Sequence, residues 1–507
     1  MTRTALFSLN DISCAEHFAE QLIQLGWDII ASSETVDLLK KKGLPVQDIA
    51  DFTGAKVNYG FPPTLNARVE YALTVDSHPH IDLVYIIPYP LSEGNDVGGR
   101  TLLALAVKGG RIAVMNIRDM KRVVSELSKT GEVSQNLQLE LADKVCFELA
   151  KHYFSLVKDR GQYDLLSGRF SYDLLNGENP YQIPASAFVS EDEDDPLSLF
   201  NFKQVSGDAS CFTNMADADC ILQTLSLAAE AFLINTGWVP YICVAAKHGN
   251  ACGMGVSGIS SVDAVEKALG GNPVAIWGGE VITNFPIDEQ LSAVLFKSDQ
   301  REHLMGDSSW MLDVVIAPSF TPEAILILGR RNRRKLIENN ALISPSLIKS
   351  GFSYRPVRGG FLRQPPASYV LNLKECKIVG HGFSENEVMS LIIAWSVAFS
   401  SSLGGNEVAF AKDGALLSAG GGPSTVEAVR VAVMRAVDCG HDTKGSAFAA
   451  DAFFPFTDAP SVLCDAGISI GCVPEGGRRE TEIKDYFRVH GGTIAYLPEK
   501  FRGFCRH

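Results

Sequence analysis

The sequence has no excess of basic residues. It carries 45 Lys and Arg against 59 Asp and Glu, a formal net charge of -14 over 507 residues. Proteins that bind nucleic acids need a basic face that displaces counterions from phosphates. The composition therefore argues against a nucleic-acid partner, although a local basic pocket for an anionic substrate remains compatible with it.

Long apolar runs and paired cysteine motifs are also missing. Runs such as Leu102–Val107 and Val314–Pro318 end long before the roughly 20 residues that a membrane helix needs. The stretch Met1–Asn10 lacks the basic and apolar parts of a signal peptide. The 11 cysteines show no CxxC or metal-finger spacing. We expect a cytoplasmic protein with reduced thiols, no bound metal and no membrane contact.

The chain is long enough for more than one domain. Its first part alternates short strands with helices, and its strands are almost continuously apolar, which predicts a parallel sheet covered on both faces. The ligand of such a sheet lies beyond the carboxyl ends of its strands, in loops such as Asp11–Cys14 and Ser32–Glu34. The predicted strands are Thr4–Leu9, Trp27–Ser32, Asp82–Pro88 and Arg111–Asn116, and the predicted helices are Ala15–Leu25, Val36–Lys42 and, within 122–159, a longer helical region.

A second, larger α/β region begins near Phe202. It contains two similar segments, Val244–Gly249 and Ala409–Gly414, each an apolar strand that delivers Ala-Lys and a polar residue before a glycine. The similarity is a weak indication of an internal duplication. The acidic run Glu191–Asp195 is typical of a solvated loop.

The strongest chemical signal is Lys247-His248-Gly249-Asn250, directly after an apolar strand. Histidine moves protons near neutral pH, and a neighbouring cation favours its neutral, basic form. A solvated lysine followed by an ordinary loop histidine would give the same letters. The residues alone leave both interpretations open.

Two other stretches carry residues that could bind a ligand at the end of a strand. Asn406, after two glycines, could donate a hydrogen bond to a developing oxyanion, although such an asparagine is also common turn chemistry. The run Asp451–Asp458 holds three phenylalanines between two carboxylates, which suits either a core or the grip on a flat heterocycle. Gly253–Gly258 and Gly467–Gly471 match dinucleotide and serine-hydrolase motifs in letters, but their context argues against both functions.

These stretches together resemble one family, the bifunctional AICAR transformylase/IMP cyclohydrolase of purine synthesis. Gly177–Gln182 resembles its Arg-Tyr-Gly-x-Asn-Pro-His-Gln block, and Asn214–Asp219 its Asn-Asn-x-x-Asp-x-Asp block. Lys247–Gly253 resembles Lys-His-x-Asn-Pro-Cys-Gly, and Ala450–Asp458 resembles Ser-Asp-Ala-Phe-Phe-Pro-Phe-x-Asp. Several motifs in the right order make the resemblance specific and nearly end to end.

The resemblance implies an α/β protein with a methylglyoxal-synthase-like parallel-sheet domain followed by two cytidine-deaminase-like domains. We expect the first domain at 1–160, a connecting segment at 161–200, and the transformylase domains at 201–365 and 366–507. It also implies a homodimer with its sites at the interface. The reaction would move a formyl group from 10-formyltetrahydrofolate to the amine of an aminoimidazole carboxamide ribotide or a related acceptor.

The resemblance also implies a role for individual residues. His248 would relay the proton of the attacking amine, Lys247 would hold it, and Asn406 would steady the tetrahedral oxyanion. Asp458, with Phe456 and Phe454, would bind the folate. The acceptor-binding residues implied in the same way are Asn179, Tyr181, Asn214, Gly279, Arg502 and Phe504.

The formyl-transfer half departs from the family at its phosphate-binding positions. Leu175 and Asn176 replace the family's Arg-Tyr, Tyr181 replaces a histidine, and Thr425 replaces a second arginine. Each charge-assisted contact from an arginine is worth about 1.5–3 kcal/mol, so two losses would weaken ribotide binding by orders of magnitude without compensation. Candidates to supply the charge are Arg330, Arg331 and Arg358. The acceptor could therefore be the ribotide or a different amine, and a silent folate- or nucleotide-binding paralogue is a third possibility.

The cyclohydrolase half departs further. The family's Ser-Asp-Lys-Thr-Gly loop is Asn10–Cys14, and its Ser-Thr-Gly-Gly-Thr phosphate loop is Ala31–Thr35, which contains Glu34. Its Arg-Val-Lys-Thr segment becomes Arg68–Tyr71, with Glu70 in place of the lysine. Carboxylates beside a phosphate repel it. We expect cyclohydrolase activity to be lost.

Overall fold

The computed structural model describes residues 2–55, 64–90, 92, 94–158, 161–190, 195–329, 333–347 and 351–503, without the side chains of Ser33, Glu34 and Gln300. The chain divides into two compact units, Met1–Leu166 (unit 1) and Ser167–His507 (unit 2). The boundary expected at residue 160 adjoins residues 159–160, which lie outside the described part, and the expected division at 365/366 stays a prediction.

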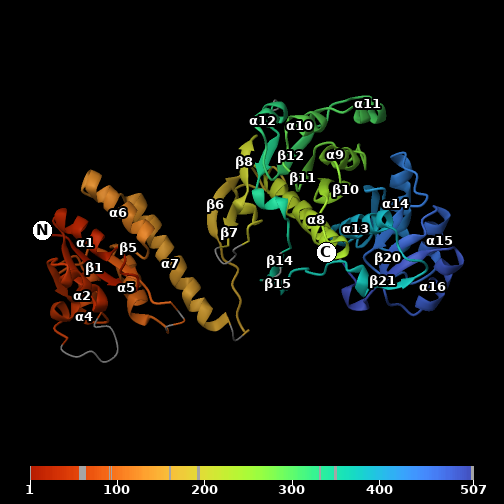
Figure 1. Ribbon diagram of the computed structural model, residues 1–507. Helices are drawn as coiled ribbons and strands as arrows, with labels where there is room; N and C mark the ends of the chain where they lie inside the picture. The colour runs from red at the N-terminus through yellow and green to blue at the C-terminus, as the bar shows by residue number, and fades with distance from the viewer. Residues whose placement is uncertain are drawn as a thin grey trace. The chain divides into compact units, whose positions relative to one another are not determined.

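Unit 1 is a parallel sheet in the order β3-β2-β1-β4-β5 with helices on both faces (Figure 1). Alternating side chains of β1 show why both faces are covered. Phe7 packs with α1 and α6 on one side, while Leu6 packs with α4 and α5 on the other. The elements are β1 (Thr4–Leu9), α1 (Ala15–Gln24), β2 (Asp28–Ala31), α2 (Ser33–Lys41), β3 (Val46–Asp48), α3 (Ile49–Thr53), α4 (Ala67–Thr74), β4 (Leu83–Ile87), α5 (Val97–Lys108), β5 (Ile112–Val114), α6 (Ile117–Thr130) and α7 (Gln135–Lys158).

The sequence predicted this alternation, the parallel sheet and the bounds of β1. The helical region expected within 122–159 is two helices, α6 and α7. Gly131 ends α6 in the left-handed conformation, with φ +78°, a common way to terminate a helix.

Unit 2 begins with a hairpin of β6 (Arg169–Leu174) and β7 (Ala185–Val189), and its main sheet has the order β16-β21-β20-β19-β17-β18-β10-β9-β11-β12-β13-β8. The strands and helices of its first half are β8 (Lys203–Ser206), α8 (Phe212–Thr236), β9 (Tyr241–Lys247), β10 (Asn250–Ser257), α9 (Ser261–Leu269), β11 (Gly279–Thr283), α10 (Glu289–Phe296), α11 (Asp299–Met305), β12 (Leu312–Ala317), α12 (Pro322–Leu328) and β13 (Lys335–Glu338). Those of its second half are β14 (Ser353–Val357), β15 (Gly360–Gln364), β16 (Lys377–Val379), α13 (Glu385–Ser400), β17 (Asn406–Lys412), β18 (Ala415–Gly422), α14 (Thr425–Asp438), β19 (Ala447–Ala450), α15 (Asp458–Asp465), β20 (Ile470–Pro474), α16 (Glu480–Val489) and β21 (Thr493–Leu497).

The two halves of unit 2 repeat one topology. In each half a hairpin (β9–β10 or β17–β18) pairs antiparallel with a third strand (β11 or β19), which continues into parallel strands. The halves join where β10 pairs antiparallel with β18, with Gly255 opposite Ala415. The internal duplication suggested by the sequence is therefore present in the fold.

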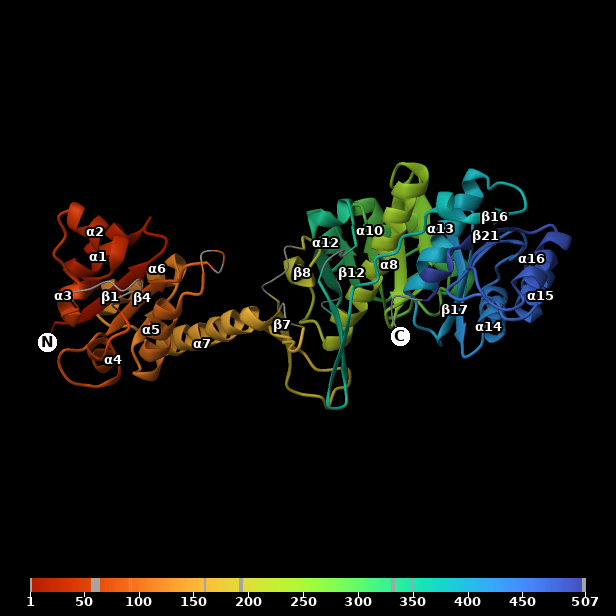
Figure 2. The same cartoon turned by 90° about the horizontal axis from the view of Figure 1, so that it is seen from below.

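Helices α8 and α13 pack together on one face of the joined sheet (Figure 2). Their contact includes a hydrogen bond of 2.7 Å between the Thr224 and Ser400 hydroxyls. The other face carries two separate cores, one under α9, α10 and α12 and one under α14, α15 and α16. No helix in the described residues is long and apolar enough to cross a membrane.

Candidate functional site

Lys247 and His248 stand on a tight turn between β9 and β10. Lys247 pairs with Asn250, so His248 and Gly249 form a two-residue loop with φ +53° and +69°, the signature of a type I′ turn. A non-glycine residue rarely adopts a positive φ, and such strain often marks a functional position. The turn leaves the His248 side chain exposed, while the Lys247 ammonium donates to the carbonyl of Trp277.

A cavity of about 240 Å³ opens beside this turn, between the two halves of unit 2. Its charged or titratable lining residues are Lys247, His248, Cys252 and Arg435. Burial raises the pKa of the Cys252 thiol to about 12, so this thiol is neutral at physiological pH. The remaining lining residues are neutral: Asn250, Ala251, Asn272, Ala275, Leu403, Ser418 and Ala419. The cavity is therefore cationic within an acidic chain.

Asn250 connects the histidine turn to the loop before Asn406. Its amide nitrogen donates to the His248 carbonyl at 3.0 Å, and its amide oxygen accepts from the Ser402 backbone N–H at 2.7 Å. The sequence separates these two segments by more than 150 positions, and the pairing of β10 with β18 brings them together. The side-chain N–H of Asn406 donates to the carbonyl of Gly422, at 3.1 Å.

A buried carboxylate organises the same loop. One oxygen of Glu407, which is 1% exposed, accepts from the backbone N–H groups of Leu403, Gly404 and Gly405 at 2.7, 2.8 and 3.2 Å. The Glu407 N–H donates to the Asp451 carboxylate at 2.7 Å. Burial, with the charge of Glu407 nearby, raises the pKa of Asp451 to about 7. Glu407 thus links the Asn406 loop to the start of the expected folate segment.

A second buried acid lies behind Lys247. Glu280 on β11 is 4% exposed and pairs in register with Ala246, and its carboxyl hydrogen-bonds that of Asp217 on α8. Burial raises the pKa of Glu280 to about 9, with further contributions from the charges of Asp217 and Asp313, while Lys247 opposes the shift. Glu280 is therefore protonated at neutral pH.

The expected folate residues lie in different environments. Phe454 is 2% exposed and packs in the core against Phe448 and Phe487, at ring-centroid distances of 5.9 and 6.4 Å. Phe456 is 52% exposed with the Arg479 guanidinium over its ring, and Asp458 is exposed at the start of α15. Phe456 and Asp458 are available to a ligand, whereas Phe454 supports the core.

The expected acceptor residues are spread over several loops. Asn179 is exposed and bonds Gln182, Tyr181 is 80% exposed, and Asn214 caps α8 through Cys211. Gly279 is buried where a Cβ would lie 2.2 Å from the Ala246 carbonyl, so glycine is required for β11 to approach β9. Arg502 is exposed and pairs with Glu499, and Phe504 lies outside the described residues.

The three arginines that the sequence offers as replacements for the missing ones stay predictions. Arg358 is exposed in the turn between β14 and β15, while Arg330 and Arg331 lie outside the described residues. The structure instead brings Arg435 of α14 into the cavity with Lys247. Arg435, Glu280 and Glu407 were missed because single charged residues within helices and strands look like ordinary surface positions in a sequence.

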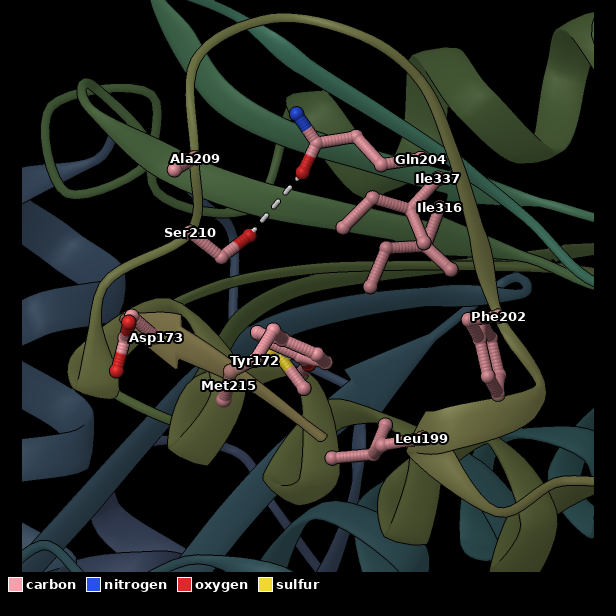
Figure 3. A pocket seen from close by; sticks show the side chains of 11 residues that line it. Tyr172, Asp173, Leu199, Phe202, Gln204, Ala209, Ser210, Met215, Ile316 and Ile337 are labelled. Carbon is pink, nitrogen blue, oxygen red and sulfur yellow. Dashed lines mark hydrogen bonds between the residues drawn. The ribbon is translucent and has the colours of Figure 1, made fainter. Parts of the chain in front are cut away.

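A larger, mainly apolar cavity of about 360 Å³ lies beside the start of α8 (Figure 3). Tyr172, Met215 and Ile316 line it, and Ser210 donates to Gln204 at 3.4 Å within it. The carbonyl of the same Ser210 accepts from the N–H of Leu175. Leu175 and Asn176, which stand where the family has Arg-Tyr, therefore lie next to an apolar cavity in this chain.

In unit 1, the loops that should bind a phosphate carry acidic side chains. Asp11 follows β1, and hydrogen bonds from Ser13 lower the pKa of its carboxyl, which keeps it ionised. Glu70 is exposed on α4, two residues after Arg68, whose guanidinium lies over Phe52. Glu34 lies in α2, but its side chain is outside the described part.

The fold and the site define a two-unit α/β protein whose second unit is duplicated, with an exposed histidine on a type I′ turn beside a cavity between the two halves. Residues 111–435 match the family model of the AICARFT/IMPCHase bienzyme, and residues 15–110 match the MGS-like domain. The chain belongs to the AICARFT/IMPCHase bienzyme family, as its resemblance predicted.

Named relatives match the chain over almost its full length. It is 29% identical to the bifunctional purine biosynthesis protein PurH of Polynucleobacter necessarius subsp. necessarius, over 98% of each chain. It is 28% identical to PurH of Neisseria meningitidis serogroup A, over 100% of this chain and 99% of the relative. The crystal structure of ForH is 26% identical, with a TM-score of 0.28, and covers 31% of this chain and 98% of its own.

Glu280→Gln should flatten the pH dependence of stability. A carboxyl whose pKa is raised on folding stabilises the fold fully below its unfolded pKa, and this contribution is lost as pH rises through the folded value of about 9. The free energy of unfolding of the unmodified protein should thus fall more between pH 5 and 9 than that of Glu280→Gln. Urea denaturation across this range measures it, with exposed Glu266→Gln on α9 as the control. Parallel pH profiles for all three proteins would contradict the assignment.

Glu407→Ala should destabilise unit 2 through the Asn406 loop. Three backbone N–H groups lose their acceptor, and water can replace it at the exposed Gly404 and Gly405, so we expect a loss of about 1–3 kcal/mol. Glu407→Gln keeps an acceptor oxygen and should lose less than half as much. Urea denaturation of both variants tests this, and equal losses would show that the acceptor is not what matters.

Proposed function

We propose that this protein is a folate-dependent formyltransferase that moves a formyl group from 10-formyltetrahydrofolate to the amine of an aminoimidazole carboxamide ribotide or a related acceptor. The observation that carries the proposal is the joining of the Lys247–His248 turn to the Asn406 loop through Asn250, beside one cationic cavity. Membership of the bienzyme family and the name of the PurH relatives support the reaction class.

In this mechanism His248 takes the proton that the amine loses as it attacks the formyl carbon. The exposed imidazole on a rigid type I′ turn suits this role, because a general base must reach the substrate without rearrangement. Lys247 stands beside it with its positive charge, held at the Trp277 carbonyl.

Asn406 would donate to the oxyanion of the tetrahedral intermediate. Its amide donates to the Gly422 carbonyl, so the side chain would have to turn to bring an N–H to the reacting centre. The folate would lie against the exposed Phe456 ring, with Asp458 binding its pterin. We also propose that the protein acts as a homodimer.

Unit 1 is proposed to have lost cyclohydrolase activity. Glu70 on α4 replaces the lysine of the family segment, and Glu34 lies in the sequence that aligns with the phosphate loop. Two carboxylates repel the phosphate that the substrate carries. A silent paralogue is the second candidate, and folate binding without turnover with any amine would favour it.

His248→Asn should lower formyl transfer by roughly 100- to 10,000-fold, the usual contribution of a positioned base. Asparagine tolerates the left-handed backbone of this position, so the turn is preserved. Tetrahydrofolate release, followed with a panel of amines, measures the effect. The matched control is Asp413→Asn, which stands at φ +51° in the equivalent turn and should keep full activity. Retained turnover in the His248 variant would exclude the assignment.

The purified protein should form no inosine monophosphate from the formylated ribotide. The reason for this expectation is the two glutamates, Glu34 and Glu70, that the sequence places in segments where the family has neutral or basic residues. Chromatography of the reaction mixture over hours checks it, with a PurH relative as the positive control. Product formation above the uncatalysed rate would prove the expectation wrong.

A further inference from the structure

The cavity beside the histidine turn contains an arginine to which the family resemblance assigns no role. Arg435 lies on the last turn of α14 and is partly buried, and one of its terminal N–H groups donates to the Ala419 carbonyl at 2.7 Å. That bond fixes the guanidinium at the cavity wall. An arginine has five N–H donors in a planar fork, so the anchored group can still offer donors to a ligand.

The charges around the cavity point to an anion. Lys247 and Arg435 both line it, and its lining includes no aspartate or glutamate. Buried acids also lie near the cavity, among them Asp217, Glu280 and Glu407. Glu280 is held in its protonated form by burial and by the neighbouring carboxyls of Asp217 and Asp313, and burial also raises the pKa of Glu407. Two cations in a partly buried cavity attract an anionic group more strongly than exposed cations do.

The size of the cavity restricts what can occupy it. At about 240 Å³ it is smaller than the ~300–1,000 Å³ of pockets that enclose a whole drug-sized ligand. It therefore fits one end of a substrate whose reacting amine lies at His248. Thr425, which stands where the family has an arginine, is 7% exposed at the start of α14, and Arg435 is on the same helix.

We propose that Arg435 and Lys247 form a subsite for the anionic group of the acceptor, a phosphate monoester or a carboxylate. This inference rests on the proposed formyl transfer, because it takes the cavity to be the acceptor site. It defines the substrate class: the acceptor amine carries a negative charge, and its uncharged counterpart is a poor ligand.

Calorimetric binding of the aminoimidazole carboxamide ribotide and of the corresponding uncharged riboside tests the subsite directly. The proteins are the unmodified chain, Arg435→Met, Arg435→Lys and, as a matched control, Arg430→Met, which removes an exposed arginine from the same helix. Loss of a bidentate, charge-assisted contact should weaken ribotide binding roughly 10- to 100-fold in Arg435→Met. Riboside and folate binding should be unchanged, Arg430→Met should match the unmodified chain, and Arg435→Lys should be intermediate.

Competition by inorganic phosphate or by acetate then separates the two anions. Displacement of the ribotide by phosphate alone assigns a phosphate subsite, and displacement by acetate alone a carboxylate subsite. The inference is overturned if the unmodified chain binds ribotide and riboside equally or binds neither. It is also overturned if Arg435→Met binds ribotide as the unmodified chain does, or loses only folate affinity. Circular dichroism checks the fold of Arg435→Met. If Arg435→Met is unfolded, the ribotide affinity of Arg435→Lys, which keeps a donor for the Ala419 carbonyl, decides the test.

The two proposals fail in different ways. Arg435-dependent ribotide binding without formyl transfer to any amine would retain the subsite and reject the proposed function. Formyl transfer to uncharged amines, with the same kcat/KM in Arg435→Met and the unmodified chain, would retain the function and reject the subsite.

Discussion

The antiparallel pairing of β10 with β18 is the contact on which the rest of unit 2 depends. It joins two repeats into one sheet through bonds such as that from the Val256 N–H to the Gly414 carbonyl, at 2.8 Å. Helices α9 and α14 pack very close to the sheet on either side of this junction, because glycines in the strands leave room for them. A Cβ on Gly255 or Gly420 would come within 2.0 or 2.4 Å of the carbonyl of Ala264 or Ala428. The histidine turn and the Asn406 loop meet only because of this junction.

Burial of acids next to that junction sets its electrostatics. A buried carboxyl that is protonated costs far less free energy than a buried carboxylate, so Glu280 can lie in the core. Backbone donors further stabilise Glu407, and the Glu407 oxygen in turn fixes three successive peptide groups. A chain with a net charge of -14 thereby keeps a cationic cavity at its candidate site.

The fold was largely predictable, since apolar strand runs and periodic helices are local signals. The Val244–Gly249 and Ala409–Gly414 similarity even indicated the duplication, because two type I′ turns need the same kind of residue at the same place. The site was predictable only where one segment carries it, as with Lys247 and His248. Arg435 and Glu280 reach the same region from α14 and β11. Their convergence depends on long-range pairing, which residue patterns along the chain do not encode. Phe454 shows the converse, since a phenylalanine of a binding motif can serve the core.

Comparison of the two repeats separates what the backbone provides from what the side chains add. His248 and Asp413 stand in the same left-handed position, and Lys247 and Lys412 each donate to a backbone carbonyl, of Trp277 and Lys444. In the first repeat, Glu280 lies opposite Ala246 in the sheet. At the equivalent place in the second repeat, Ala447 lies opposite Ala411. Identical turns therefore hold an exposed imidazole backed by a protonated acid in one repeat and an exposed carboxylate backed by alanine in the other. Since the two turns share one backbone conformation, any chemistry that belongs to the first turn alone has to come from these side-chain differences.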